Sequence, residues 1–199
     1  TARTDGGPAR PIPPGMTDSA FFGPRVVRAA FVIAVFGWGF GFYGPPVFLH
    51  AVIARTGWSL AFVSTCVTLH FLSGAVVMAR LPALYARFGV PRVTAAGAVV
   101  LGLGTVVWGL APDPAWLVAG ALLTGMGWVA LGAAAINAII APWFVRTRPH
   151  ALAMAYNGAS VGGILFSPAW GASIAAIGFG WSAAIAGAAM VLTVGWLAR

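Results

Sequence analysis

The chain alternates six long apolar stretches with short gaps that hold nearly all of its charged residues. A helix crosses the apolar core of a bilayer with about 20 predominantly apolar residues, and each stretch is close to that length or longer. The predicted membrane spans are residues 28–53, 58–80, 93–111, 115–141, 151–174 and 181–198. A composition that is 60% hydrophobic, with a mean hydropathy of +0.94, is not typical of a soluble domain. The pattern therefore predicts an all-α integral membrane protein.

Charge is distributed unequally between alternate gaps. All eleven basic residues are arginines, and only Arg55 lies in a gap on the side opposite to the rest. The other arginines are Arg3, Arg10, Arg25, Arg28, Arg80, Arg87, Arg92, Arg146, Arg148 and Arg199. Because cytoplasmic loops carry an excess of Lys and Arg, both ends of the chain are expected to be cytoplasmic, in a bacterial inner membrane. These arginines bracket spans and form no basic face, so a nucleic-acid partner is not expected.

Two regions follow from this pattern. Residues 1–24 are expected to be a disordered cytoplasmic tail, because residues 1–15 are rich in Pro, Gly and Arg. Met16 is a candidate start, so residues 1–15 are expected not to be native. Residues 25–199 are expected to form one six-helix bundle, continued by sequence beyond Arg199.

Acidic residues are absent from all six predicted spans. The acidic residues are Asp5, Asp18 and Asp113, and the histidines are His50, His70 and His150. Acid–base catalysis and carboxylate proton relays need carboxylates at depth, and the histidines lie at three different depths without the Cys/His cluster of a metal site. We therefore expect no enzyme activity, no metal and no cofactor.

Polar side chains inside the spans are few, and His70 is the only ionisable one predicted near mid-membrane. Such a residue is a functional hypothesis, because its burial is costly. A protonated His70 could bind an anionic substrate or carry a proton. Alternatively, a neutral His70 could hydrogen-bond within the bundle, through Thr68 or Ser73. Asn137 and Asn157 are expected as buried amides that join spans four and five, with contact to the substrate as the alternative.

The first span contains two adjacent prolines just beyond its midpoint. Pro45 and Pro46 lack amide donors and clash with the preceding turn, so the helix is expected to kink or open there. A broken helix at depth is tolerated only where protein or a water-filled cavity satisfies the freed carbonyls. The side chains that would border such a cavity are Trp38, Phe42 and Tyr43, together with Trp128 of the fourth span. The alternative is a structural kink whose rings pack against lipid or core.

Tryptophan positions support the spans, because Trp is enriched at membrane–water interfaces. The tryptophans near predicted outer ends are Trp58, Trp108, Trp116, Trp170 and Trp181, and those near inner ends are Trp143 and Trp196. Only Trp38 and Trp128 are expected near mid-membrane.

Glycines recur inside the spans at helical spacing. Gly37 and Gly41 lie four residues apart in the first span, and Gly158 and Gly162 in the fifth. Small residues at this spacing allow close helix packing in lipid. The motif at Gly37-Trp38-Gly39 is repeated at 127–128, which opens the second set of three spans. Three is odd, so the two sets would have opposite orientations, as in inverted repeats.

Several of these residues match a known family pattern. Segment 82–92 resembles the G-x-x-x-D-R-x-G-R-R loop of the major facilitator superfamily, although Pro82 and Ala86 replace the first Gly and the Asp. The matching residues are Arg87, Gly89 and Arg92. Segment 121–127 is similar to the motif R-x-x-x-G-x-G, with Ala121 in place of Arg.

The region around span five resembles one branch of that superfamily, the bacterial monocarboxylate / oxalate–formate-like transporters. The residues that match its W-F-x-x-x-R-x-x-A…G-x-S-x-G-G signature are Trp143, Phe144, Arg148, Ala151, Gly158, Ser160, Gly162 and Gly163. The resemblance covers about residues 20–199.

The resemblance implies the N-terminal six-helix half of a 12-helix transporter, built as two inverted three-helix repeats. It implies secondary active transport, by alternating access, of a small organic anion such as a monocarboxylate. The implied partners are membrane lipid, a small-molecule substrate, and the missing C-terminal half or a second copy. The expected substrate-binding residues are Trp38, Phe42, Tyr43, His70 and Trp128, and the expected gating loop holds Arg87, Gly89 and Arg92. The charge relay of that loop and proton coupling through position 121 are not carried over, because their acidic and basic residues are replaced.

Two other functions stay open. Efflux of amphipathic compounds fits an uncharged, aromatic midplane. A structural or self-pairing six-helix membrane protein belongs to another class and needs no solute site.

Overall fold

The computed structural model describes residues 22–199, and these residues form an all-helical bundle. Its helices are α1 (Gly23–Gly41), α2 (Gly44–Thr56), α3 (Leu60–Phe88), α4 (Val90–Leu110), α5 (Pro114–Val129), α6 (Ala133–Ile140), α7 (Arg148–Ile177) and α8 (Phe179–Leu197). Six helical segments are long and apolar enough to cross a membrane, because α1–α2 and α5–α6 each count as one span. The prediction of an all-α multi-pass membrane protein is confirmed. Met16 and most of the predicted tail lie outside the described residues, and α1 already begins at Gly23.

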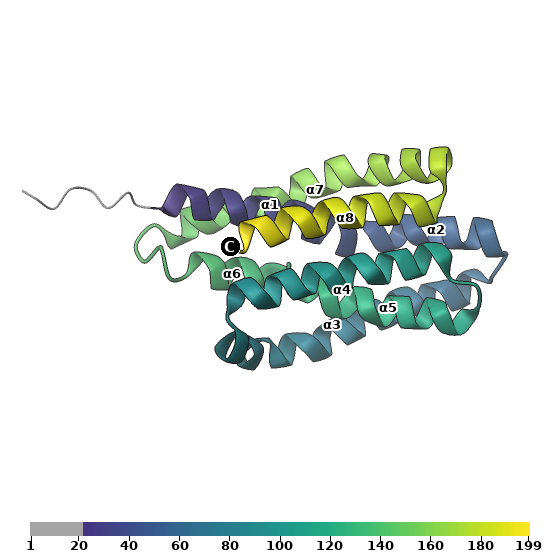
Figure 1. Cartoon of the computed structure of the whole chain (residues 1–199), viewed down its shortest axis with the longest axis horizontal. Helices are drawn as coiled ribbons and strands as arrows, with labels where there is room; N and C mark the ends of the chain where they lie inside the picture. Colours follow the sequence, from purple (N-terminus) through teal and green to yellow (C-terminus); the bar gives the residue numbers. More distant parts are fainter. Residues whose placement is uncertain (1–21) are drawn as a thin grey trace, which may run out of the picture.

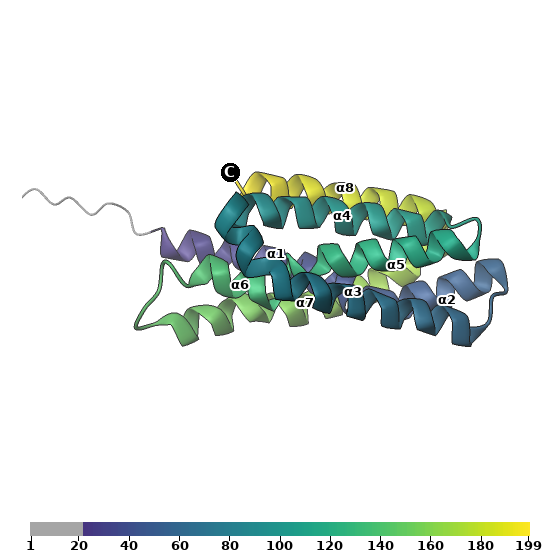
Figure 2. The same cartoon turned by 90° about the horizontal axis from the view of Figure 1, so that it is seen from below.

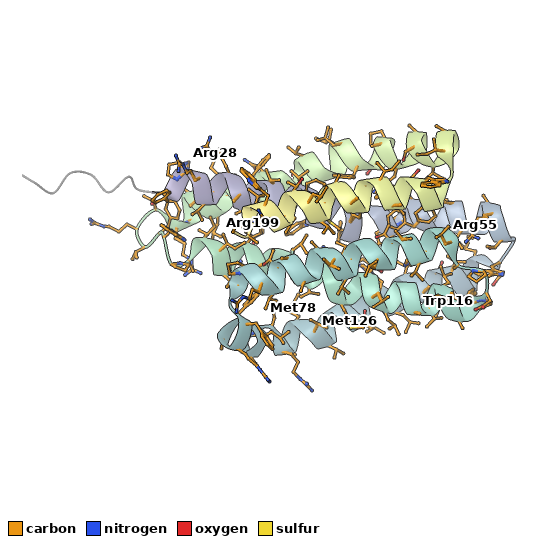
Figure 3. All side chains as sticks on the ribbon, in the orientation of Figure 1. Arg28, Arg55, Met78, Trp116, Met126 and Arg199 are labelled. Carbon is orange, nitrogen blue, oxygen red and sulfur yellow. The ribbon has the colours of Figure 1, made fainter. Side chains whose placement is uncertain are left out.

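The helices run side by side along one long axis (Figures 1 and 2). Helix α1 packs on α7, α3 packs on α5, and α4 packs on both α5 and α8. The start of α1, the α3–α4 turn, the α6–α7 segment and the C-terminus all lie at one end (Figure 1). We call it the Arg-rich end; Figure 3 shows Arg28 and Arg199 there and Arg55 at the opposite end.

Arg55, the arginine at the opposite end, has a structural role. Its Nη2 donates to the carbonyl of Ala111 at 3.1 Å and approaches that of Trp108 at 3.5 Å. The Trp108 carbonyl belongs to the last turn of α4, and the Ala111 carbonyl follows it. Carbonyls at the end of a helix lack intrahelical donors, and the helix dipole favours a cation there. Arg55 therefore caps α4 from α2.

The segment expected to be a loop between spans two and three is helical. Helix α3 continues through Pro82 to Phe88, and α4 begins at Val90. Only Gly89 is non-helical: its φ is +81°, and its N–H donates to the Tyr85 carbonyl at 2.9 Å. Glycine adopts positive φ without steric cost, so one residue reverses the chain. The residues predicted to form a gating loop, Arg87, Gly89 and Arg92, therefore occupy a helix end, a one-residue turn and a helix start.

Two tryptophans expected near the outer ends of spans are buried in the core of the bundle. Trp108 and Trp170 are 1% and 2% exposed. Both pack against Phe48 of α2, with ring centroids 6.1 and 4.9 Å away, and Phe179 of α8 lies 4.9 Å from the same ring. Four helices converge on Phe48 and turn these two rings into the bundle. Their depth at the membrane interface stays a prediction.

Helices α1 and α7 make a close backbone contact through glycine. A Cβ at Gly158 would meet the Phe31 carbonyl oxygen, and a Cβ at Gly162 would meet that of Val35. The four-residue spacing on α7 thus matches a four-residue spacing on α1. Gly37 similarly lies against the Leu131 carbonyl, where a Cβ would be 2.8 Å from the oxygen. Side-chain-free contact of this kind lets membrane helices approach closely.

Candidate functional site

The first span is interrupted at Phe42 and Tyr43, where the sequence predicts a kink. The N–H groups of both residues donate to the Trp38 carbonyl, at 3.1 and 2.9 Å. In a regular helix the Tyr43 N–H would instead donate to Gly39, and residue 45 would donate to Gly41. Pro45 has no N–H. The break therefore leaves the Gly39 and Gly41 carbonyls without their usual donors.

Side chains from two other helices replace these donors. His70 Nε2 of α3 lies 2.9 Å from the Gly41 carbonyl oxygen. Trp170 Nε1 of α7 lies 3.2 Å from the Gly39 carbonyl oxygen. An unsatisfied backbone group in a bilayer costs several kcal/mol, so these donors stabilise the break.

His70 is 0% exposed and both of its ring nitrogens have partners. Because a carbonyl only accepts, Nε2 carries the hydrogen, and in a neutral ring Nδ1 accepts from the Thr124 hydroxyl 2.9 Å away. The Thr124 hydroxyl also lies 3.0 Å from the Ala121 carbonyl. Its single hydrogen therefore serves either the imidazole or that carbonyl. No ring nitrogen of His70 is left for a solute in this conformation.

The predicted intramolecular partners of His70 were wrong. The Thr68 hydroxyl donates to the Ser64 carbonyl at 3.2 Å, within its own helix. The Ser73 hydroxyl reaches the carbonyls of His70 and Leu122, at 2.9 and 3.1 Å. Both hydroxyls donate to backbone carbonyls, of α3 for Thr68 and of α3 or α5 for Ser73, whereas the imidazole bonds the Gly41 carbonyl of α1 and the Thr124 hydroxyl of α5.

A second break, which the sequence did not predict, interrupts the fourth span at residues 130–132. Three successive N–H groups there donate to carbonyls three residues earlier, a 3₁₀ pattern. They are Ala130 to Gly127 (3.2 Å), Leu131 to Trp128 (2.9 Å) and Gly132 to Val129 (3.3 Å). The two breaks lie beside each other, because a Cβ at Gly41 would meet the Trp128 indole. Gly132 was the only local signal for this break.

Aromatic side chains surround the first break. Phe42 lies 5.1 Å from Tyr43, 6.4 Å from Phe71 and 6.3 Å from Trp128 between ring centroids. Trp128 stacks on His70 at 5.7 Å with an interplanar angle of 23°. We call these five residues the Phe42 cluster. Phe42 is 46% exposed and Phe71, which the sequence analysis did not single out, is 38% exposed.

The cluster holds one buried side-chain polar atom without a hydrogen-bond partner. Trp128 Nε1 is buried and has no hydrogen-bond partner among residues 22–199. An indole nitrogen only donates, so this atom is suited to an acceptor. The cluster contains no carboxylate, Arg or Lys. It therefore offers aromatic surface, one buried N–H donor and the Tyr43 hydroxyl, without a fixed charge.

Trp38 lies apart from the Phe42 cluster. Its ring makes an edge contact with Tyr156, 6.0 Å away at 86°. The Tyr156 hydroxyl lies 2.7 Å from Asn137 Nδ2, so this group joins α1, α6 and α7. Asn137 thus links spans four and five as expected, whereas Asn157 is exposed, and its predicted burial is wrong.

Trp170→Phe tests one cap of the break. The substitution keeps an aromatic side chain, although a smaller one, and removes the donor to Gly39, so we expect the free energy of unfolding to fall by about 2 kcal/mol. Trp181→Phe is the matched control, because Trp181 is exposed on α8. Unfolding titrations in mixed micelles measure both, and an equal small effect of the two substitutions would contradict the capping role.

The described residues contain no group of three His, Cys, Asp or Glu side chains that could hold a metal ion. The sequence matches no protein-family model and no curated protein. The resemblance to the major facilitator superfamily therefore stays a prediction that rests on the residues quoted for it.

Proposed function

We propose that this chain is one six-helix bundle of a secondary transporter that moves a small organic solute by alternating access, with the Phe42 cluster at the solute site. The observation that carries the proposal is the capped break of the first span beside the break of the fourth. Interrupted helices near the midplane are a recurrent way to build transporter binding sites. Irregular backbone at that depth requires protein donors, and His70 and Trp170 are such donors.

Part of the helix packing agrees with the proposed inverted repeats, whereas the extensive contact of α4 with α5 has only a weak counterpart between α8 and α1. Exchanging the first three spans with the last three pairs the first span with the fourth, and both are broken. The same exchange maps the contact of α1 with α7 onto the contact of α5 with α3, and both contacts are extensive. The contact of α4 with α8 maps onto itself.

The proposed substrate is a small organic anion, as the resemblance implies. The free N–H of Trp128 is a donor for a carboxylate oxygen. A buried anion also needs an opposite charge, which would come from a second six-helix bundle, either in a C-terminal half or in another copy. Exposed Phe42 and Phe71 lie on the face that this bundle would cover.

The second candidate is efflux of amphipathic compounds. The absence of any fixed cation in the Phe42 cluster favours it, because an uncharged or cationic solute needs no basic partner. Aromatic faces also attract cations.

A thermal-shift experiment on the purified protein separates these candidates. A ligand present at 100 times its Kd stabilises the folded state by about 2.7 kcal/mol, so the binding class raises the Tm. A rise with small carboxylates supports the anion, and a rise with bulky amphipathic cations supports efflux. We expect Phe42→Ala to remove the shift and Leu72→Ala, an exposed position on α3 outside the cluster, to retain it.

The alternative of a structural or self-pairing protein predicts a different result. Neither class of compound would raise the Tm, and the chain would form a defined oligomer in lipid nanodiscs without any solute. The thermal-shift experiment measures the first outcome, and native mass spectrometry measures the second. Both outcomes together would rule out the transport proposal.

A further inference from the structure

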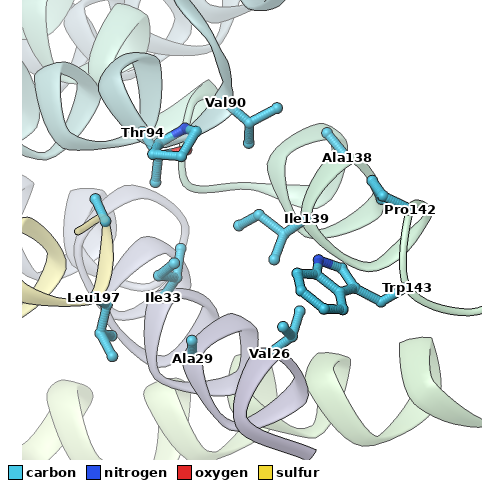
Figure 4. A pocket seen from close by; sticks show the side chains of 12 residues that line it. Val26, Ala29, Ile33, Val90, Thr94, Ala138, Ile139, Pro142, Trp143 and Leu197 are labelled. Carbon is cyan, nitrogen blue, oxygen red and sulfur yellow. The ribbon is translucent and has the colours of Figure 1, made fainter. Parts of the chain in front are cut away.

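Cavities at the Arg-rich end differ in the charge of their walls. The cavity drawn in Figure 4 lies between α1, α4, α6 and the end of α8, and its volume is about 380 Å³. Its lining is nearly all apolar, and no charged side chain of residues 22–199 belongs to it. This cavity therefore offers no cation to an anionic ligand.

Another cavity at this end lies between the beginnings of α1 and α7 and has basic side chains in its wall. Its volume is about 400 Å³, within the range of about 300–1,000 Å³ typical of ligand pockets. We call it the Arg28 cavity. Its lining residues include Val27, Arg28, Thr147, His150, Ala151 and Met154. Arg28, Thr147, His150 and Met154 are exposed, so the cavity opens onto the protein surface.

Arg28 supplies the fixed positive charge of this cavity. Its Nε donates to the Pro24 carbonyl at 3.4 Å, and Pro24 lines the same cavity, so the guanidinium lies along the α1 wall. That contact is the only hydrogen bond of Arg28 within residues 22–199. The only carboxylate side chain in this part of the chain is Asp113, which caps the start of α5 at the other end of the bundle (Figure 1). The Nη groups of Arg28 are therefore available to an anionic ligand.

Two further donors come from the α7 side of the cavity. His150 offers a ring N–H in either neutral tautomer, and the hydroxyl of Thr147 can donate as well. Thr147 is the N-cap residue of α7, but its side chain makes no capping bond. Donors from two helices suit an anion with several acceptor oxygens, and arginine pairs particularly well with phosphate.

The rest of the wall is apolar and lies where two spans begin. Val27, Ala151 and Met154 form this part, and Met154 is 48% exposed. Apolar surface of this kind stabilises an acyl chain but contributes nothing to a free phosphate ion. Helix α1 begins at Gly23 and α7 at Arg148, so the cavity is at the level of lipid head groups. The Arg-rich end is also the end expected on the cytoplasmic side, where leaflets carry anionic lipids.

We propose that the Arg28 cavity binds the head-group phosphate of an anionic phospholipid, with the first part of one acyl chain along Val27 and Met154. Basic pockets between membrane helices on the cytoplasmic side are suited to such head groups. The site is separate from the Phe42 cluster and does not depend on the proposed transport. Its test measures lipid binding, so its failure would leave the transport proposal unchanged.

Photo-cross-linking in the intact protein tests the site. The full chain is placed in phosphatidylcholine nanodiscs that contain phosphatidylglycerol with a diazirine near the ester of one acyl chain, and labelled peptides are mapped. We expect labels within residues 24–28 and 147–154, competed by unlabelled phosphatidylglycerol. The matching phosphatidylcholine probe has the same phosphate but no net charge. We expect it to label these residues about fivefold less, the ratio that corresponds to about 1 kcal/mol.

Variants identify the side chains that hold the head group. Arg28→Gln is expected to reduce labelling by the phosphatidylglycerol probe about fivefold. Arg80→Gln is the matched control, because Arg80 is exposed on α3, which packs on α5 and does not line the cavity. His150→Ala is expected to reduce labelling about twofold to fivefold, whereas His50→Ala on α2 is expected to leave it unchanged.

Three outcomes would overturn the proposal. Equal labelling by the two lipid probes would show that the cavity does not select an anionic head group. Competition by inorganic phosphate as strong as that by phosphatidylglycerol would assign the cavity to a soluble anion. Unchanged labelling in both Arg28→Gln and His150→Ala, with a Tm equal to that of the unmodified protein, would show that these side chains do not hold the lipid.

Discussion

Replacing His70 with alanine is expected to lower the free energy of unfolding by about 2 kcal/mol, and Pro45→Ala is expected to relieve part of that loss. His70→Ala leaves the Gly41 carbonyl without a donor, and a buried unsatisfied acceptor costs about 1–3 kcal/mol. The same substitution removes the partner of Thr124. Gly41 and Thr124, the two partners of the imidazole, are both buried.

The double substitution isolates the Gly41 contact. Alanine at position 45 restores an N–H four residues after Gly41, which can donate to the carbonyl that His70 otherwise binds. The Thr124 contact is lost equally in both backgrounds, so the difference between the two His70→Ala effects reports Gly41 alone. Unfolding titrations of the four proteins in mixed micelles give this coupling. An identical effect of His70→Ala with proline and with alanine at position 45 would show that the imidazole does not stabilise the break through Gly41.

Gly158→Val is expected to destabilise the bundle by about 3 kcal/mol, the upper part of the range for overpacked cores. The new side chain would meet the Phe31 carbonyl oxygen of α1. That obstacle is backbone, which cannot rotate away as a side chain can, so α1 and α7 would have to separate. The substitution would also disturb the break, because α1 ends at Gly41 and Trp170 reaches it from α7.

Gly171→Val provides the control on the same helix. A Cβ at Gly171 meets no atom within 4 Å. Both substitutions introduce the same β-branched side chain into α7, so propensity effects cancel in the comparison. Thermal unfolding followed by size-exclusion chromatography measures the difference. Similar Tm values for the two variants would contradict the close α1–α7 contact.

Together these experiments address how a broken span is held in place. Helix α7 contributes both the glycine contact to α1 and the Trp170 cap, while α3 contributes His70. Helices α3 and α7 are the second and fifth spans, which are equivalent in the proposed inverted repeat. Movement of either helix would change the donors available to the break, so the caps couple helix position to the geometry of the Phe42 cluster.

The amino-acid sequence by itself determined the number of spans and the position of the first break. Hydropathy over about 20 residues and the missing N–H of Pro45 are local properties, readable without any partner. It also indicated the arginine asymmetry and a small-residue role for Gly158. Of the candidate site, the sequence identified Phe42, Tyr43, His70 and Trp128 as residues of similar depth.

Only the tertiary structure decided which groups satisfy the break. The donors to Gly41 and Gly39 lie 29 and 131 residues away in the chain. The sequence placed Trp170 near an outer span end, but it did not show that the indole is buried beside Phe48 and caps the Gly39 carbonyl. The second break and the helical segment around Gly89 were also decided by packing and backbone geometry. Hydrogen bonds across a bundle depend on which helix faces are neighbours, and that information is absent from the local pattern along each span.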